Sequence, residues 1–394
     1  MKNKNFFIKA FSLIKNKKQL YFLFFFSIIG VFVELLSIAI VVPVVVFLIE
    51  QNPLEKFQTL EPIFNFLSIS TKNEIITFSL LGIVIVYFFR FSFLIFLHYY
   101  KNLFSYNLNL NVKKDLIDQY LSQKYSYFLN QNSSRLIKNI IVEISHFAGG
   151  AVDHLFYIFI DIFVIITVFA SLMFFEPFIS LIIAFFLILV GLLLNALSKG
   201  RVTRWGKLRF DLDQDFMKFM IEMFKSIREI KVYGKKIFFV KSFMQKYSPL
   251  GYLSVKQQTF NAIIKQSYET VTLYAFCLLI FYLFNQNYSN QEILTIIGIF
   301  TIAAFRLLPL FSRMLLGVQN LKYYLPSINH LYSEFNELSK NIKSSNYMKQ
   351  SKNLRIKNSF EFKNISFSYD KDKNILDNMI LKINKNDKIG IFGK

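Results

Sequence analysis

Hydrophobic residues are gathered into six long runs along the chain, separated by segments in which polar residues return. A helix needs about 20 mostly apolar residues to cross the hydrocarbon core of a bilayer. The runs that satisfy this length are roughly 20–49, 75–99, 151–175, 178–197, 267–284 and 294–316. We therefore predict an all-α membrane domain with six transmembrane helices, and the pattern excludes an ordinary soluble enzyme.

A short amphipathic segment precedes the first run. Phe7, Phe11 and Ile14 lie at helical spacing within the basic stretch 1–19, a pattern typical of a helix that lies in the membrane interface. The first run is about 30 residues long, whereas the core of a signal peptide has ~7–15 residues. We therefore expect an interfacial elbow helix followed by an uncleaved span. Between the first two spans, residues 53–69 fit either an interfacial helix that contacts substrate or a plain loop helix.

The connections between the runs differ in charge and in length. The first 19 residues carry six lysines, segment 100–146 carries six cations, and segment 198–255 carries thirteen, whereas segment 285–291 carries none. By the positive-inside rule, both termini and the two long connections are expected in the cytoplasm. These long connections have helical periodicity and little proline or glycine. Spans 2 to 5 are therefore expected to continue as long helices beyond the membrane, joined in pairs by short turn helices.

The end of the chain changes character. Amphipathic helix is expected to continue from the sixth span to about residue 338, where a polar linker, 339–353, begins. From residue 354 the apolar spacing becomes that of strands. The pattern predicts two strands at 360–367 and 379–383, a turn at 384–387 and a third strand at 388–392.

The overall composition agrees with a membrane protein. The 394 residues are 54% hydrophobic and only 18% charged, against ~25% charged in soluble domains. The net charge of +21 would suit nucleic acid or anionic lipid. However, lysine, asparagine, isoleucine and phenylalanine are all abundant, as an AT-rich coding sequence produces, and we predict no nucleic-acid partner. The lone Cys277 and four scattered histidines predict no disulfide and no metal site.

Residues 354–394 resemble the opening of an ABC transporter nucleotide-binding domain. In that family an aromatic residue after the first strand stacks on adenine, and Tyr369 is at the matching position; the alternative is an ordinary surface tyrosine. A hydrophobic strand then leads into a phosphate-binding loop of the form G-x-x-x-x-G-K-[ST], whose first glycine would be Gly393. The resemblance implies ATP and Mg²⁺ as cofactors of a longer chain. Because the loop is truncated after two residues, we expect no catalytic residue and no ATP hydrolysis from the chain as it stands.

The membrane part resembles exporter-type (type IV) ABC transporters, which have six spans and two long cytoplasmic excursions. Tyr127 and Phe128, followed by 134–136, resemble the first coupling segment of such exporters, and 227–234 resembles the second. Solvated helix tips are the alternative. The resemblance implies four parts, which are an elbow at 1–19, a transmembrane domain at 20–338, a linker at 339–353 and a truncated ATP-binding domain at 354–394. It also implies a second half-transporter as partner, most simply another copy.

Scattered motifs also resemble bacterial flippases of lipid-linked oligosaccharides. They are Val31–Glu34 with Pro43, Tyr87–Arg90, and Phe305–Pro309 with Arg313. The resemblance implies a bacterial inner-membrane protein that contacts membrane lipid and moves a lipid-linked polyanionic substrate. Two other functions stay open at this point, a peptide or drug exporter and a passive channel or scaffold.

Ionisable residues within the spans are candidate functional residues because they are costly to hold in the membrane. The candidates for substrate binding are Glu34, Arg90, Lys265, Arg306 and Arg313, and Asp161 is a second buried acid. Four cations against two acids leave a positive lining. Such a lining suits a pyrophosphate headgroup, which accepts bidentate contacts from arginine, and disfavours cationic drugs. The alternative is that the acids pair with the arginines only to hold the helices together.

Overall fold

The computed structural model describes residues 12–14, 17–41, 43–44, 72–129, 131–175, 177–198, 200–285, 290–343, 358–368 and 375–390. The long helices are α2 (Lys17–Ala39), α6 (Lys72–Leu121), α9 (Asp153–Phe175), α10 (Pro177–Ser198), α11 (Arg201–Lys225), α13 (Lys236–Asn285) and α14 (Asn290–Lys343). Shorter elements are α7 (Tyr125–Leu129), α8 (Ser133–Lys138), the π-helices η2 (Asn139–Glu143) and η3 (His146–Val152), α12 (Ile227–Val232), β1 (Ser359–Phe367) and β2 (Leu376–Asn384). The chain divides into two compact units, Met1–Ile117 with Ser134–Phe335 and Asp118–Ser133 with Asn336–Lys394.

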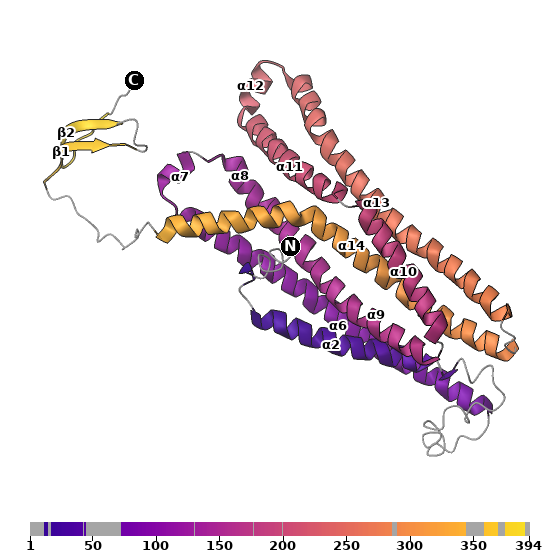
Figure 1. Ribbon diagram of the computed structural model, residues 1–394. Helices are drawn as coiled ribbons and strands as arrows, with labels where there is room; N and C mark the ends of the chain where they lie inside the picture. Colours follow the sequence, from indigo (N-terminus) through magenta and orange to yellow (C-terminus); the bar gives the residue numbers. More distant parts are fainter. Residues whose placement is uncertain are drawn as a thin grey trace. The chain divides into compact units, whose positions relative to one another are not determined.

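The predicted fold class is confirmed. Within the described ranges, six helical segments are long and apolar enough to cross a membrane. Helices α6 and α13 each have 50 residues and α14 has 54, so each is more than twice as long as the ~20 residues that a span requires. Short helices, α7 and α12, stand at the two turns where turn helices were expected (Figure 1).

The first span is shorter than its hydrophobic run. The run continues to about residue 49, but α2 ends at Ala39. A turn at Ile40 interrupts the helix, and the described residues 41, 43 and 44 are again helical. Of the predicted elbow, the structure describes residues 12–14 and the start of α2, with Leu13 and Ile14 buried. The predicted loop helix at 53–69 lies outside the described residues.

The core of the first unit lies among α9, α10, α13 and α14. Its buried residues include Val168 of α9, Leu187 of α10, Tyr268 of α13 and Leu307 of α14. Helix α10 contacts both α9 and α13, and α2 packs against α9. Helix α11 runs beside α13 (Figure 1). Helices from both ends of the sequence therefore meet in one bundle, where their charged residues can pair.

The end of the chain forms a two-stranded antiparallel sheet, in which Phe360 pairs with Ile383 and Phe362 with Leu381. The predicted turn after β2 is confirmed, because the backbone N–H of Asp387 donates to the backbone oxygen of Asn384 at 3.1 Å. The third strand is wrong over its described part, since 388–390 have no strand geometry. A strand needs a neighbour for its hydrogen bonds, and none pairs with these residues in the described segments. The small sheet is consistent with the start of a nucleotide-binding domain.

Candidate functional site

Glu34 of α2 holds two arginines that come from two other helices. Arg90 of α6 donates from Nη2 to Glu34 Oε1 at 2.9 Å and from Nε to Oε2 at 2.5 Å. Arg306 of α14 donates from Nη1 to Glu34 Oε1 at 3.0 Å. The three side chains are at most 20% exposed. One carboxylate shared by two guanidinium groups leaves one net positive charge in this triad.

Tyr87 and Ser37 complete the surroundings of Arg306. Its Nη2 donates to the Tyr87 hydroxyl at 3.0 Å and to Ser37 Oγ at 3.2 Å. The Tyr87 ring also lies 5.6 Å from the Arg90 guanidinium and 5.5 Å from that of Arg306, within the range of a cation–π attraction. In the sequence Tyr87 was only the first residue of the flippase-like motif Tyr87–Arg90 and was not a candidate for the site, although it stands one helical turn before Arg90.

A second pair joins α9 to α14. Arg313 donates from Nε to Asp161 Oδ2 at 2.8 Å and from Nη2 to Asp161 Oδ1. The carboxylate of Asp161 is fully buried, whereas the Arg313 side chain is 45% exposed. The Arg313 guanidinium also lies 5.2 Å from the centre of the Tyr157 ring. The pair is therefore neutral as a whole, and part of the Arg313 side chain remains exposed.

A third ion pair, between Lys101 and Asp153, was not predicted from the sequence. Lys101 of α6 donates to Asp153 Oδ2 at 3.2 Å and to the Tyr157 hydroxyl at 2.8 Å. Asp153, Tyr157 and Asp161 are four residues apart on α9 and therefore share one helix face. The four-residue spacing in the sequence could have indicated a polar face on this helix. Lys101 lies just beyond the hydrophobic run, so it was counted only among the cations of the cytoplasmic connection. We use the name ion-pair ladder for three groups together: Glu34 with Arg90 and Arg306, Asp161 with Arg313, and Asp153 with Lys101.

The other predicted site residues do not join the ladder. Lys265 lies 3.9 Å from Glu269 on its own helix, and its side chain is 66% exposed. Tyr369 and Gly393 lie outside the described residues.

The positive charge of the membrane domain is smaller than the sequence indicated. Four candidate cations against two acids gave a surplus of two positive charges. With Arg90, Arg306 and Arg313 set against Glu34 and Asp161, the surplus in these paired residues is one.

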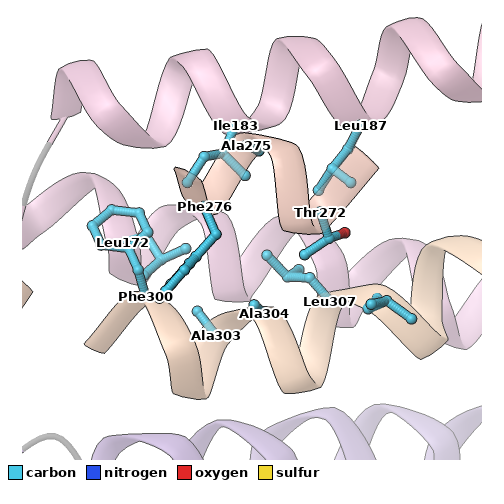
Figure 2. Close-up of a pocket in the computed structure, with 11 residues that line it drawn as sticks. Leu172, Ile183, Leu187, Thr272, Ala275, Phe276, Phe300, Ala303, Ala304 and Leu307 are labelled. Carbon is cyan, nitrogen blue, oxygen red and sulfur yellow. The ribbon is translucent and has the colours of Figure 1, made fainter. Parts of the chain in front are cut away.

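An apolar cavity of about 30 Å³ lies among α9, α10, α13 and α14 (Figure 2). Its lining side chains are apolar except for that of Thr272, whose Oγ1 has no hydrogen-bond partner in the described part of the chain. A water molecule needs two to four polar partners to occupy a buried site. The cavity is therefore a packing gap in the core, too small and too apolar to hold an amphiphilic ligand.

Another group of charged residues lies where α11 packs against η2 and α14. Lys138 and Glu143 are both buried, 3.1 Å apart, and Lys138 also donates to the backbone oxygen of Phe210 at 2.8 Å. Arg209 donates to Ser327 Oγ at 2.8 Å and lies 3.6 Å from Asp213. We call these residues the α11 cluster. They come from three segments far apart in the sequence, so the cluster fixes the position of α11.

Asp213 makes the stability of the α11 cluster depend on pH. Burial raises its pKa to about 6, with Arg209 opposing, whereas an unfolded aspartate has a pKa of ~3.9. The folded state therefore prefers the protonated acid. The stability that this group contributes is complete below pH ~3.9 and is lost as the pH rises through about 6.

We expect Asp213→Asn to raise the free energy of unfolding by about 1–3 kcal/mol at pH 7.5 and by roughly half as much at pH 5. The fluorescence of Trp205, the chain's one tryptophan, reports unfolding of α11 in detergent. A loss of stability of equal size at both pH values would instead show that Asp213 acts mainly as the partner of Arg209.

Residues 20–307 match the family model that describes the ABC transporter transmembrane region. The match covers more than half of the chain. It includes Glu34, Arg90, Asp161 and Arg306, and it ends before Arg313 and the two-stranded sheet.

Proposed function

The chain belongs to the ABC transporter transmembrane family, and we propose that it is the membrane half of an ATP-driven flippase for an amphiphile with an anionic head. The family membership and the six apolar helices make it a multi-pass transport protein. Such a domain generally pairs with a second half-transporter or with nucleotide-binding domains. Beyond this, we propose that ATP supplies the energy and that the substrate is an amphiphile with an anionic head. We also propose that the protein is a homodimer in the bacterial inner membrane, with both termini in the cytoplasm.

The partly exposed side chain of Arg313 is the observation that supports the proposed substrate class. Its Nε and Nη2 bind the buried Asp161, while the side chain as a whole is 45% exposed. Nη1 makes no hydrogen bond to the residues that the structure describes. A phosphate oxygen accepts charge-assisted bonds from such a group more strongly than from a neutral donor.

Arg306 and Arg313 form a path for an anionic head along α14. Seven residues return a helix to nearly the same face, about 10 Å further along its axis. The Glu34 triad at one end keeps one uncompensated positive charge. A head with two phosphates suits this arrangement, whereas a cationic drug would be repelled by the uncompensated charge of the triad.

The contacts between residues of the flippase-like motifs support a lipid-linked diphosphate as the substrate. Glu34, Tyr87, Arg90 and Arg306 come from three separate motifs, and their side chains meet in one hydrogen-bonded group. ATP with Mg²⁺ is the proposed energy source, bound by the domain whose first strands are β1 and β2. Tyr369 is at the proposed position for stacking on adenine.

Equilibrium binding in nanodiscs of zwitterionic lipid tests the substrate class without requiring ATP hydrolysis. The ligands are a short-chain polyprenyl diphosphate and the matched polyprenol. We expect the diphosphate to bind at least tenfold more tightly, and Arg313→Gln to lose about tenfold of that affinity, because a charge-assisted hydrogen bond contributes roughly 1.5–3 kcal/mol. Arg313→Lys should recover part of the loss, since an ammonium lacks the planar fork.

Lys218→Gln is the matched control, because this lysine is 52% exposed on α11 and pairs only weakly with Glu222. It should leave binding of both ligands unchanged. Equal affinity for the diphosphate and the alcohol, or diphosphate binding that is unaffected by Arg313→Gln, would overturn the proposed substrate class. Tighter binding of a cationic peptide than of the diphosphate would favour the peptide exporter.

A further inference from the structure

A groove of about 330 Å³ lies between the start of α2 and α6, at residues that do not belong to the ion-pair ladder. Its polar lining residues include Lys18, Gln19 and Asn107, and its apolar wall includes Phe22, Leu103 and Phe104. The lining contains no acidic residue. The groove therefore has one cationic end and one apolar side, the arrangement that an amphiphile with an anionic head requires.

The surrounding side chains mark the depth of the groove in the membrane. Tyr21, Tyr99 and Tyr106 flank its lining residues along the chain and are more than 60% exposed. Tyrosines are enriched where the hydrocarbon core meets the headgroups. Lys18 lies in the first turn of α2, directly before the apolar part of that helix. The cationic end therefore lies at headgroup level, and the apolar wall extends toward the hydrocarbon.

We propose that this groove binds a phospholipid with an anionic headgroup from the surrounding membrane. The phosphate lies against Lys18 and Gln19, and the first part of an acyl chain packs along Phe22, Leu103 and Phe104. A volume of about 330 Å³ is at the lower end of the range for small-molecule sites, so it holds the head and the start of one chain. This site is independent of the proposed substrate.

Native mass spectrometry of the detergent-solubilised 394-residue chain tests the site, with phosphatidylglycerol and phosphatidylcholine added in equal amounts. We expect phosphatidylglycerol to be retained in preference. Lys18→Gln should lower that preference about fivefold, because one lysine near a membrane surface contributes roughly that factor to attraction of anionic lipid. Inorganic phosphate at the same concentration should not displace the lipid, since it lacks a chain for the apolar wall.

Lys17→Gln is the matched control, because Lys17 is the exposed preceding residue and does not line the groove. It should leave the preference unchanged. Leu103→Trp fills the groove and should lower retention of both lipids, whereas Tyr106→Trp, outside the lining, should not. Equal effects of Lys17→Gln and Lys18→Gln, or an unchanged preference in Lys18→Gln, would overturn the proposal. Lipid retention that is unaffected by Leu103→Trp would also overturn the proposal. This variant keeps the test valid if Lys18→Gln does not fold.

Discussion

Gly206→Ala is expected to separate α11 from α14 and to lower the free energy of unfolding by about 3 kcal/mol or more. A Cβ atom at this position would lie 2.1 Å from the backbone oxygen of Tyr323 and 2.9 Å from its carbonyl carbon. A flexible side chain could rotate away from such a contact, but helix backbone cannot. The helices must therefore move apart, and the hydrogen bond from Arg209 to Ser327, 2.8 Å long in the native packing, is lost with them.

Gly251→Ala provides the matched control for this prediction. Gly251 lies inside α13, and a Cβ atom there would meet no atom within 4 Å. Alanine is a better helix former than glycine, so this variant should be neutral or more stable by up to ~1 kcal/mol. Thermal unfolding in detergent, followed by the fluorescence of Trp205 beside Gly206, measures both variants. Similar midpoints for the two would show that α11 and α14 do not pack at this distance.

The sequence predicted the helices well because their signals are local. Hydrophobic runs and helical periodicity need only neighbouring residues, and they located α10 (Pro177–Ser198) to within a residue of the predicted span at 178–197. The sequence did not predict the end of α2 at Ala39, because the residues on both sides of the turn at Ile40 are apolar and hydropathy alone does not mark a break there. The π-helices were missed as well, since an i→i+5 turn has no clear composition of its own.

The pairing within the ion-pair ladder was less predictable. Which acid meets which arginine depends on how each helix is rotated about its axis, and one sequence does not fix that rotation. The candidates Glu34, Arg90 and Arg306 were found because charges inside a span are costly. Lys265 was added by the same rule, but its position at the edge of the run allows its side chain to reach solvent. The close approach at Gly206 was likewise invisible, since glycine occurs in helices for several reasons.

Glu34 was a candidate for substrate binding in the sequence, and in the structure it is the carboxylate that pairs with two arginines. Glu34→Ala is expected to lower the free energy of unfolding by about 3–5 kcal/mol, because it leaves buried charge without a partner. Two guanidinium groups, from Arg90 and Arg306, would then face each other at most 20% exposed. The repulsion between them adds to the cost of holding them away from water. Thermal unfolding in detergent and the fraction of monodisperse protein after purification measure the effect.

Two further variants identify the cause. Glu222→Ala, on an exposed acid of α11 that lies 3.9 Å from Lys218, should change stability by less than ~1 kcal/mol, as exposed ion pairs do. The triple variant Glu34→Gln, Arg90→Gln, Arg306→Gln removes all three charges together and should recover most of the lost stability, since a neutral replacement of a buried pair is often tolerated.

The same triple variant separates assembly of the bundle from substrate binding. If the triad only holds α2, α6 and α14 together, a stable triple variant should bind the polyprenyl diphosphate as the native chain does. Our proposal gives the opposite expectation, because the uncompensated positive charge of the triad is removed along with its ion pairs. A stable triple variant with at least tenfold weaker diphosphate binding, and unchanged binding of the polyprenol, would assign both roles to the same three residues. An unstable Glu34→Ala that the triple variant does not rescue would show that the Glu34 carboxylate supports the fold by contacts other than these two arginines.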